Sequence, residues 1–148
     1  MIRLSIRNLG NQITDQMKNT NTIHKISTDE ITVTLRPDGI VHLYIHPETE
    51  ISKKTLLSIS SSLKQLVGED SIPLIVEAGE FVSVNKEAKE YAKNYESEID
   101  VISRAVITKN LAQKIIANYY YKNRTVSSPV EEFDTIKEGV EWLTKFIT

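Results

Sequence analysis

The chain has 148 residues, of which 40% are hydrophobic and 26% charged, and its formal net charge is −2. This composition is typical of a single globular domain, and it argues against a dedicated nucleic-acid-binding protein, which carries a basic surface. The chain contains no cysteine, which excludes disulfides, thiolate metal ligands and a cysteine nucleophile. No apolar run approaches the ~20 residues of a membrane span, and the N-terminus lacks a signal-peptide core, so we expect a cytoplasmic protein without a membrane span.

Residues 1–23 differ from the rest of the chain. The start alternates Ile2, Leu4 and Ile6, which is a weak strand signal, and a polar stretch rich in Asn and Thr follows. We interpret this segment as an N-terminal extension or edge strand, either loosely held or serving as a dimerising arm. The domain proper is then residues 24–148.

The clearest local unit is a hairpin over residues 31–46. "ITVTLR" and "IVHLYIH" alternate apolar and polar residues around the Pro-Asp-Gly turn of "RPDGI". One face should be buried, and the other should carry Ile40, His42, Tyr44 and His46. Four strand residues span ~13 Å, so the two histidines cannot share a metal ion in a regular strand. We expect this face to be solvated or covered by a partner, with no metal site.

The rest of the chain alternates helices with strands. Helical periodicity predicts helices within 52–68, 85–97, 109–123 and 134–148, and short apolar runs predict strands at 72–78, 101–108 and 129–133. Ser52 and Gly68 have the residue types of a helix N-cap and a helix stop. In the third helix, Leu111, Ile115 and Tyr119 are expected to form the buried stripe. The order β-β-α-β-α-β-α-β-α predicts an α/β fold with parallel crossovers after one antiparallel hairpin.

This order of elements resembles the SpoIIAA-like fold of STAS domains, the anti-sigma-factor antagonists. The segments "DGIVHLYI", "SVNKEAKEY", "SRAVITKNLAQKIIANYYYK" and "FDTIKEGVEWL" are similar to those of small bacterial STAS-like proteins of uncharacterised function. The resemblance covers residues 24–148. It implies a right-handed β-α superhelix with a mostly parallel sheet, and a non-enzymatic role in binding partner proteins.

The resemblance also points to the loop after the third strand. In the regulatory branch of the family, a kinase phosphorylates a Ser or Thr there, in an Asp-Ser-Ser/Thr-Gly type of loop that opens a helix. The corresponding residues 81–86 contain Ser83 as the only hydroxyl, without the acidic residue or the glycine. Asn85 fits the N-cap of the next helix. We treat Glu80, Phe81, Ser83 and Asn85 as a candidate partner-contact or switch loop, with helix capping as the structural alternative.

Three consecutive tyrosines form the most unusual local feature. Successive helix residues are about 100° apart, so Tyr119, Tyr120 and Tyr121 cannot all face one core. Tyrosine is enriched at protein interfaces. Tyr120 and Tyr121, together with His42 and Tyr44, are therefore the candidate interface residues, and packing beneath neighbouring loops is the alternative.

Two functions remain open. The sequence contains no readable nucleophile–base–acid arrangement, no glycine-rich phosphate loop and no cluster of metal ligands, so we expect no enzymatic activity, cofactor or metal. The first function is a STAS-like interaction or regulatory module, acting as a homodimer or with another protein partner. The alternative is a small apolar-ligand or lipid-binding domain, since STAS-like folds are distantly similar to the CRAL-TRIO lipid-transfer fold. That alternative needs spare apolar lining, whereas almost every apolar stripe here is expected to serve an ordinary core.

Overall fold

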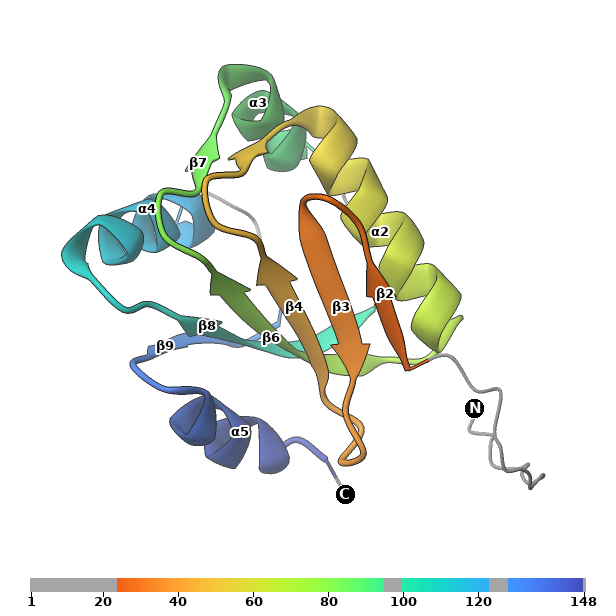
Figure 1. The fold of residues 1–148 in the computed structure, drawn as a ribbon. Helices are drawn as coiled ribbons and strands as arrows, with labels where there is room; N and C mark the ends of the chain where they lie inside the picture. The colour runs from red at the N-terminus through yellow and green to blue at the C-terminus, as the bar shows by residue number, and fades with distance from the viewer. Residues whose placement is uncertain (1–23, 95–99, 123–127, 148) are drawn as a thin grey trace.

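The computed structural model describes residues 24–94, 100–122 and 128–147. Within these residues, one six-stranded sheet has the order β2-β3-β4-β6-β8-β9 (Figure 1). Its strands are β2 (Lys25–Ser27), β3 (Ile31–Leu35), β4 (Val41–Ile45), β6 (Ile72–Ala78), β8 (Val101–Ile107) and β9 (Val130–Phe133). Strands β2, β3 and β4 are antiparallel, and β4, β6, β8 and β9 are parallel. The predicted α/β fold, mostly parallel with an antiparallel N-terminal hairpin, is confirmed.

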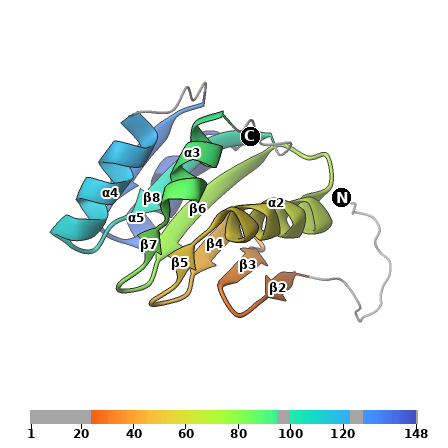
Figure 2. The same ribbon diagram turned by 90° about the horizontal axis from the view of Figure 1, so that it is seen from above.

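Four helices of the described residues cover the two faces of this sheet. They are α2 (Lys53–Val67), α3 (Lys86–Asn94), α4 (Leu111–Lys122) and α5 (Ile136–Thr144), each within a predicted helical segment. Helices α2, α3 and α4 lie over one face, and α5 lies on the other (Figures 1 and 2). A short parallel pair, β5 (Glu50–Ile51) with β7 (Ser83–Val84), was not predicted, because two-residue strands leave no periodic pattern.

The turn of the hairpin is closed by its own side chains. Gly39 has φ 88°, which its lack of a Cβ permits. The Asp38 carboxylate accepts hydrogen bonds from Arg36 Nη2 at 2.9 Å and from the Ile40 N–H at 3.1 Å. Partial burial raises the pKa of the Asp38 carboxyl, but the hydrogen bonds and charge of Arg36 outweigh it, so the pKa lies below its ordinary value. The predicted Pro-Asp-Gly turn is present.

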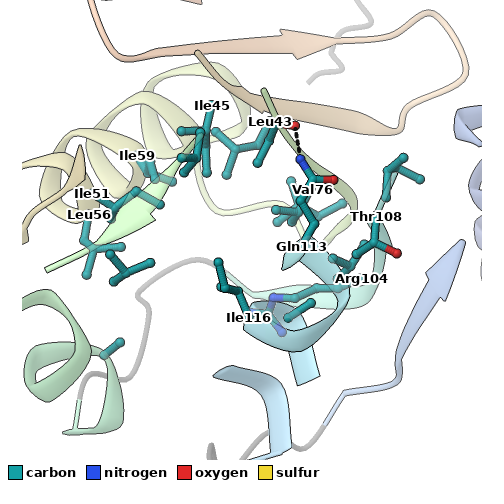
Figure 3. A pocket seen from close by; sticks show the side chains of 18 of the residues that line it. Leu43, Ile45, Ile51, Leu56, Ile59, Val76, Arg104, Thr108, Gln113 and Ile116 are labelled. Atoms are coloured by element: carbon teal, nitrogen blue, oxygen red, sulfur yellow. Dashed lines mark hydrogen bonds between the residues drawn. The ribbon is translucent and has the colours of Figure 1, made fainter. Parts of the chain in front are cut away.

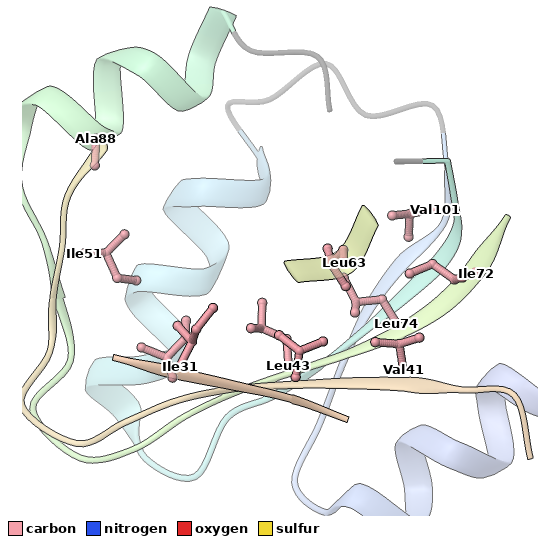
Figure 4. Packing of buried hydrophobic residues seen from close by; sticks show 11 residues of the cluster. Ile31, Val41, Leu43, Ile51, Leu63, Ile72, Leu74, Ala88 and Val101 are labelled. Carbon is pink, nitrogen blue, oxygen red and sulfur yellow. The ribbon is translucent and has the colours of Figure 1, made fainter. Parts of the chain in front are cut away.

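The core has one part on each side of the sheet. The alternating residues of β3 and β4 meet Leu63 of α2 (Figure 4), in a cluster whose buried members are Ile31, Val33, Val41, Leu43, Ile45, Ile51, Leu63, Ile72, Leu74, Ala88 and Val101. On the other face, Leu143 of α5 packs with Ile40, Ile75, Ala105 and Ile107. The expectation for Ile40 is therefore wrong, because α5 covers this part of the face and buries its side chain completely. Strand β6 contributes to both faces, which is typical of a strand with a continuous apolar sequence.

The first helix begins and ends as predicted. The Ser52 hydroxyl accepts the Thr55 N–H at 3.2 Å, and the Thr55 hydroxyl accepts the Ser52 N–H at 3.1 Å, which together form a capping box. Gly68 ends the helix with φ 62°. These contacts fix where the β5 strand joins α2.

Candidate functional site

The loop after β6 carries an exposed aromatic residue in a constrained backbone. The Gly79 N–H donates to the Ile45 carbonyl oxygen at 2.8 Å, and a Cβ at Gly79 would lie 2.7 Å from Pro47, so only glycine fits there. Phe81 follows with φ 62°, and its side chain is 79% exposed. This left-handed backbone costs an L-residue roughly 1–2 kcal/mol. Residues held in strained backbone conformations cluster at functional sites, and here the strained residue also exposes an aromatic ring.

Ser83 and Asn85 have different structural roles. Ser83 is exposed in β7, and its N–H donates to the Thr49 carbonyl oxygen at 3.0 Å. The Asn85 side-chain oxygen accepts the Ala88 N–H at 2.8 Å, so Asn85 is the N-cap of α3. The capping interpretation is confirmed for Asn85. Ser83 lies in the strand before the cap.

The first turn of α4 is fastened to the end of β6. The Gln113 side-chain nitrogen donates to the Ala78 carbonyl oxygen at 3.2 Å, and its side-chain oxygen accepts the Lys109 N–H at 2.8 Å. The Asn110 side chain accepts the Gln113 N–H at 2.9 Å and caps the helix. The Gln113 side-chain nitrogen also lies 3.5 Å from the Gly79 carbonyl oxygen, so the first turn of α4 lies next to the start of the loop that carries Phe81.

The predicted buried stripe of α4 is wrong. Leu111 is 71% exposed and Ile115 is 59% exposed, while the Tyr119 side chain lies outside the described residues. Ala117 is buried instead, and Gln113 faces the end of β6, because its amide bonds to that backbone. Leu111 and Ile115 of this helix therefore face the solvent. For brevity, the name exposed apolar patch denotes the three separately exposed side chains of Phe81, in the loop after β6, and of Leu111 and Ile115, on α4.

An apolar cavity of about 220 Å³ lies between the sheet and helices α2, α3 and α4 (Figure 3). Aliphatic side chains from β4, β5, β6, α2 and α4 point into it, including Ile45, Ile51, Leu56, Ile59, Val76 and Ile116. Polar residues Arg104, Thr108 and Gln113 lie toward the α4 side. The sequence did not reveal this cavity, because the stripe of α4 was expected to fill that space.

Polar side chains occupy the opposite face of β4 and β6. Glu77 is 9% exposed, accepts a hydrogen bond from His42 Nε2 at 2.9 Å and forms an ion pair with Lys109 Nζ at 3.2 Å. Tyr44, the neighbour of Glu77 across the β4–β6 pair, is half-buried, and its ring lies 5.8 Å from that of His46.

The two strand histidines have separate partners. His46 Nδ1 donates to the Asp29 carbonyl oxygen at 2.9 Å, and its Nε2 lies 2.8 Å from the Thr32 hydroxyl. His42 is engaged with Glu77. Among the residues that the structure describes, no group of three or more His, Asp or Glu side chains could hold a metal ion.

The candidate residues are thus brought together only in part. Glu80 and Phe81 are exposed in one loop, and the Glu80 carbonyl oxygen accepts the Glu48 N–H at 2.8 Å. His42 and Tyr44 lie on the other face of the sheet. The side chains of Tyr120 and Tyr121, like residues 1–23, lie outside the described residues. Within the described ranges, no helix is long and apolar enough to cross a membrane.

A family model described as a domain of unknown function, DUF7793, matches residues 33–147. The chain belongs to this family. The matched part of this DUF7793 domain runs from β3 to just beyond α5, and it includes the Phe81 loop, α4 and the residues around the cavity.

One solved structure similar to this DUF7793 domain is that of a protein with unknown function from Arthrobacter sp. FB24. The two chains are 19% identical, the match covers 76% of this chain and 92% of that chain, and the TM-score is 0.30. No curated protein matches the chain.

Proposed function

We propose that this DUF7793 domain is a non-enzymatic, STAS-like protein-interaction module, and that it binds its partner through the exposed apolar patch. The observation that carries the proposal is Phe81, whose ring is 79% exposed on a backbone with φ 62°. Burying the ring against a partner would remove its apolar surface from water, which is favourable. Aromatic side chains of this kind contribute much of the binding energy of many protein interfaces.

The STAS-like assignment is supported by the order of the elements. An antiparallel hairpin is followed by strands β6, β8 and β9, which add in parallel toward one edge with a helix after each. The SpoIIAA-like superhelix has this order in the family that the sequence resembles. The Phe81 loop follows the third predicted strand, which is the regulatory position of that family.

The local chemistry favours constitutive binding over a phosphorylation switch. Ser83 lies in β7, two residues before the Asn85 cap, and that cap already accepts the Ala88 N–H at 2.8 Å. A phosphate on Ser83 would therefore not occupy the N-cap of α3. We propose that partner binding depends on the apolar patch and is independent of a phosphate at Ser83.

A site-specific photo-crosslinker tests this proposal in the organism that encodes the protein. The crosslinking residue replaces Phe81, and the matched control replaces Leu57, which is 46% exposed on α2. We expect position 81 to give one discrete adduct, of twice the chain mass if the partner is a second copy, and position 57 to give none. Equal adducts from both positions, or none from position 81, would contradict the proposal.

A further inference from the structure

The two faces of the sheet are packed to different extents. Under α5, Leu143 and Ile75 are fully buried, and a Cβ at Gly139 would already lie 3.2 Å from the Ala105 Cβ. Under α4, the sheet borders the cavity of about 220 Å³. Protein interiors are normally close-packed, because side chains around an empty volume lose dispersion contacts. The space beneath α4 is therefore a specific feature of that face.

The cavity is lined mainly by aliphatic side chains and is open on one side. Ile45 and Val76 border it from the sheet, Ile59 borders it from α2, and Ile116 and Ala117 border it from α4 (Figure 3). Ile116 lines the cavity and is also 42% exposed. Its position shows that the cavity reaches the protein surface beside α4.

The polar residues at the rim are engaged with the protein itself. The Gln113 amide bonds to the Ala78 carbonyl oxygen and to the Lys109 N–H. The Thr108 hydroxyl accepts a hydrogen bond from Lys114 Nζ at 3.4 Å, and Arg104 Nη1 donates to the Ser128 hydroxyl at 3.2 Å. An apolar ligand would leave these contacts in place.

We infer that this cavity binds a small, uncharged, apolar molecule, with the size of one aromatic ring or a short branched hydrocarbon. An apolar cavity of about 150 Å³ lined by Leu, Ile and Phe stays dry and binds benzene or xenon. The cavity here is of similar size and is also lined mainly by aliphatic side chains, but it is open on one side. The ligand is held by dispersion contacts and by the removal of apolar surface from water.

Two variants test the inference with benzene as the probe, and each replaces one alanine of α4 with leucine. Ala117→Leu adds three carbon atoms to a residue that lines the cavity, whereas Ala112→Leu makes the same change on the exposed side of the helix. Benzene should raise the Tm of the wild type and of Ala112→Leu alike. In Ala117→Leu, the affinity for benzene should fall at least tenfold, because the added side chain occupies the binding volume.

Equal benzene-induced shifts in all three proteins, or no shift in the wild type, would overturn the inference. A second measurement covers the case in which Ala117→Leu does not fold. A crystal of the wild-type protein under xenon pressure should show xenon between Val76, Ile59 and Ile116. Xenon bound elsewhere only, or no bound xenon, would also overturn it.

Discussion

The side-chain nitrogen of Gln113 lies 3.2 Å from the carbonyl oxygen of Ala78, and this hydrogen bond joins the first turn of α4 to the end of β6. It places Gln113 of α4 against the residue that ends β6. On the same helix, Leu111 and Ile115 are exposed, while Ala117 is buried and lines the cavity. The exposed apolar patch and the cavity therefore share the helix α4.

Replacing Gln113 with Ala should lower the free energy of unfolding by about 1–2 kcal/mol, since it removes two hydrogen bonds of a partly buried amide. It should also speed amide hydrogen exchange in α4 more than in α5. Gln65→Ala, on the exposed surface of α2, is the matched control and should change neither quantity appreciably. Faster exchange in both helices would show that Gln113 has no specific role in fastening α4.

Phe81→Gly should make the protein more stable. Glycine adopts φ 62° without the penalty of a Cβ, so the free energy of unfolding should rise by up to about 1 kcal/mol. Phe81→Leu keeps the Cβ and should leave stability within about 0.5 kcal/mol of the wild type. Denaturant unfolding checks both variants, and a destabilised Phe81→Gly protein would mean that the ring is needed for folding.

Asn85→Ala should cost about 1 kcal/mol of stability, because it removes the side-chain acceptor for the Ala88 N–H. Ser83→Ala should change the free energy of unfolding by less than about 0.5 kcal/mol, since Ser83 is exposed. Thermal unfolding monitored by circular dichroism distinguishes the two. Loss of partner binding in Ser83→Ala, with no effect of Asn85→Ala on stability, would reverse the roles assigned to these residues.

Ser103→Ala should stabilise the protein by about 1 kcal/mol. The Ser103 hydroxyl is fully buried and has no hydrogen-bond partner among the described residues, so its removal ends a desolvation cost. Thr55→Val is the contrasting variant. The buried Thr55 hydroxyl donates to Glu30 Oε1 at 2.9 Å, and its loss should be destabilising. In urea unfolding, the free energy of unfolding should rise for Ser103→Ala and fall for Thr55→Val. Changes of the same sign would contradict the view that the Ser103 hydroxyl is unpaired and the Thr55 hydroxyl is paired.

Asp38 should make the hairpin sensitive to acid. Its folded-state pKa lies below the ordinary value of 3.8, so the stabilisation is fully present above that value and is lost as the pH falls through the folded pKa. The wild type should therefore be more stable than Asp38→Asn at pH 7, and the difference should shrink below pH ~4. A difference that stays constant with pH would show that the charge of Asp38 contributes nothing.

The parts of the fold that the sequence predicts are the strands whose regularly spaced apolar side chains pack in the core. The alternation of "ITVTLR" and "IVHLYIH" identified the buried residues of β3 and β4, and the apolar "IPLIVEA" identified a strand buried on both faces. The sequence also identified Asn85 as an N-cap. This was possible because an N-cap residue bonds to a backbone N–H of the helix that directly follows it, so its residue type and position are sufficient.

The orientation of α4 was not predictable in the same way. A helical stripe shows which residues share a face, but it does not show whether that face meets the sheet or the solvent. The decisive contact joins Gln113 to Ala78, which lies far away in the sequence. The ion pair of Glu77 with Lys109 and the hydrogen bond from His42 are also contacts between separate strands and loops, and no sequence spacing predicts them.

The most direct test of the account compares the wild type with Phe81→Gly in binding the partner that is crosslinked at position 81, whether another protein or a second copy. Calorimetry or analytical ultracentrifugation gives the Kd. We expect Phe81→Gly to be at least as stable as the wild type and to bind at least tenfold more weakly, because the aromatic anchor is lost while the fold is kept. An unchanged Kd in this stable variant would contradict the claim that the exposed apolar patch is the binding surface.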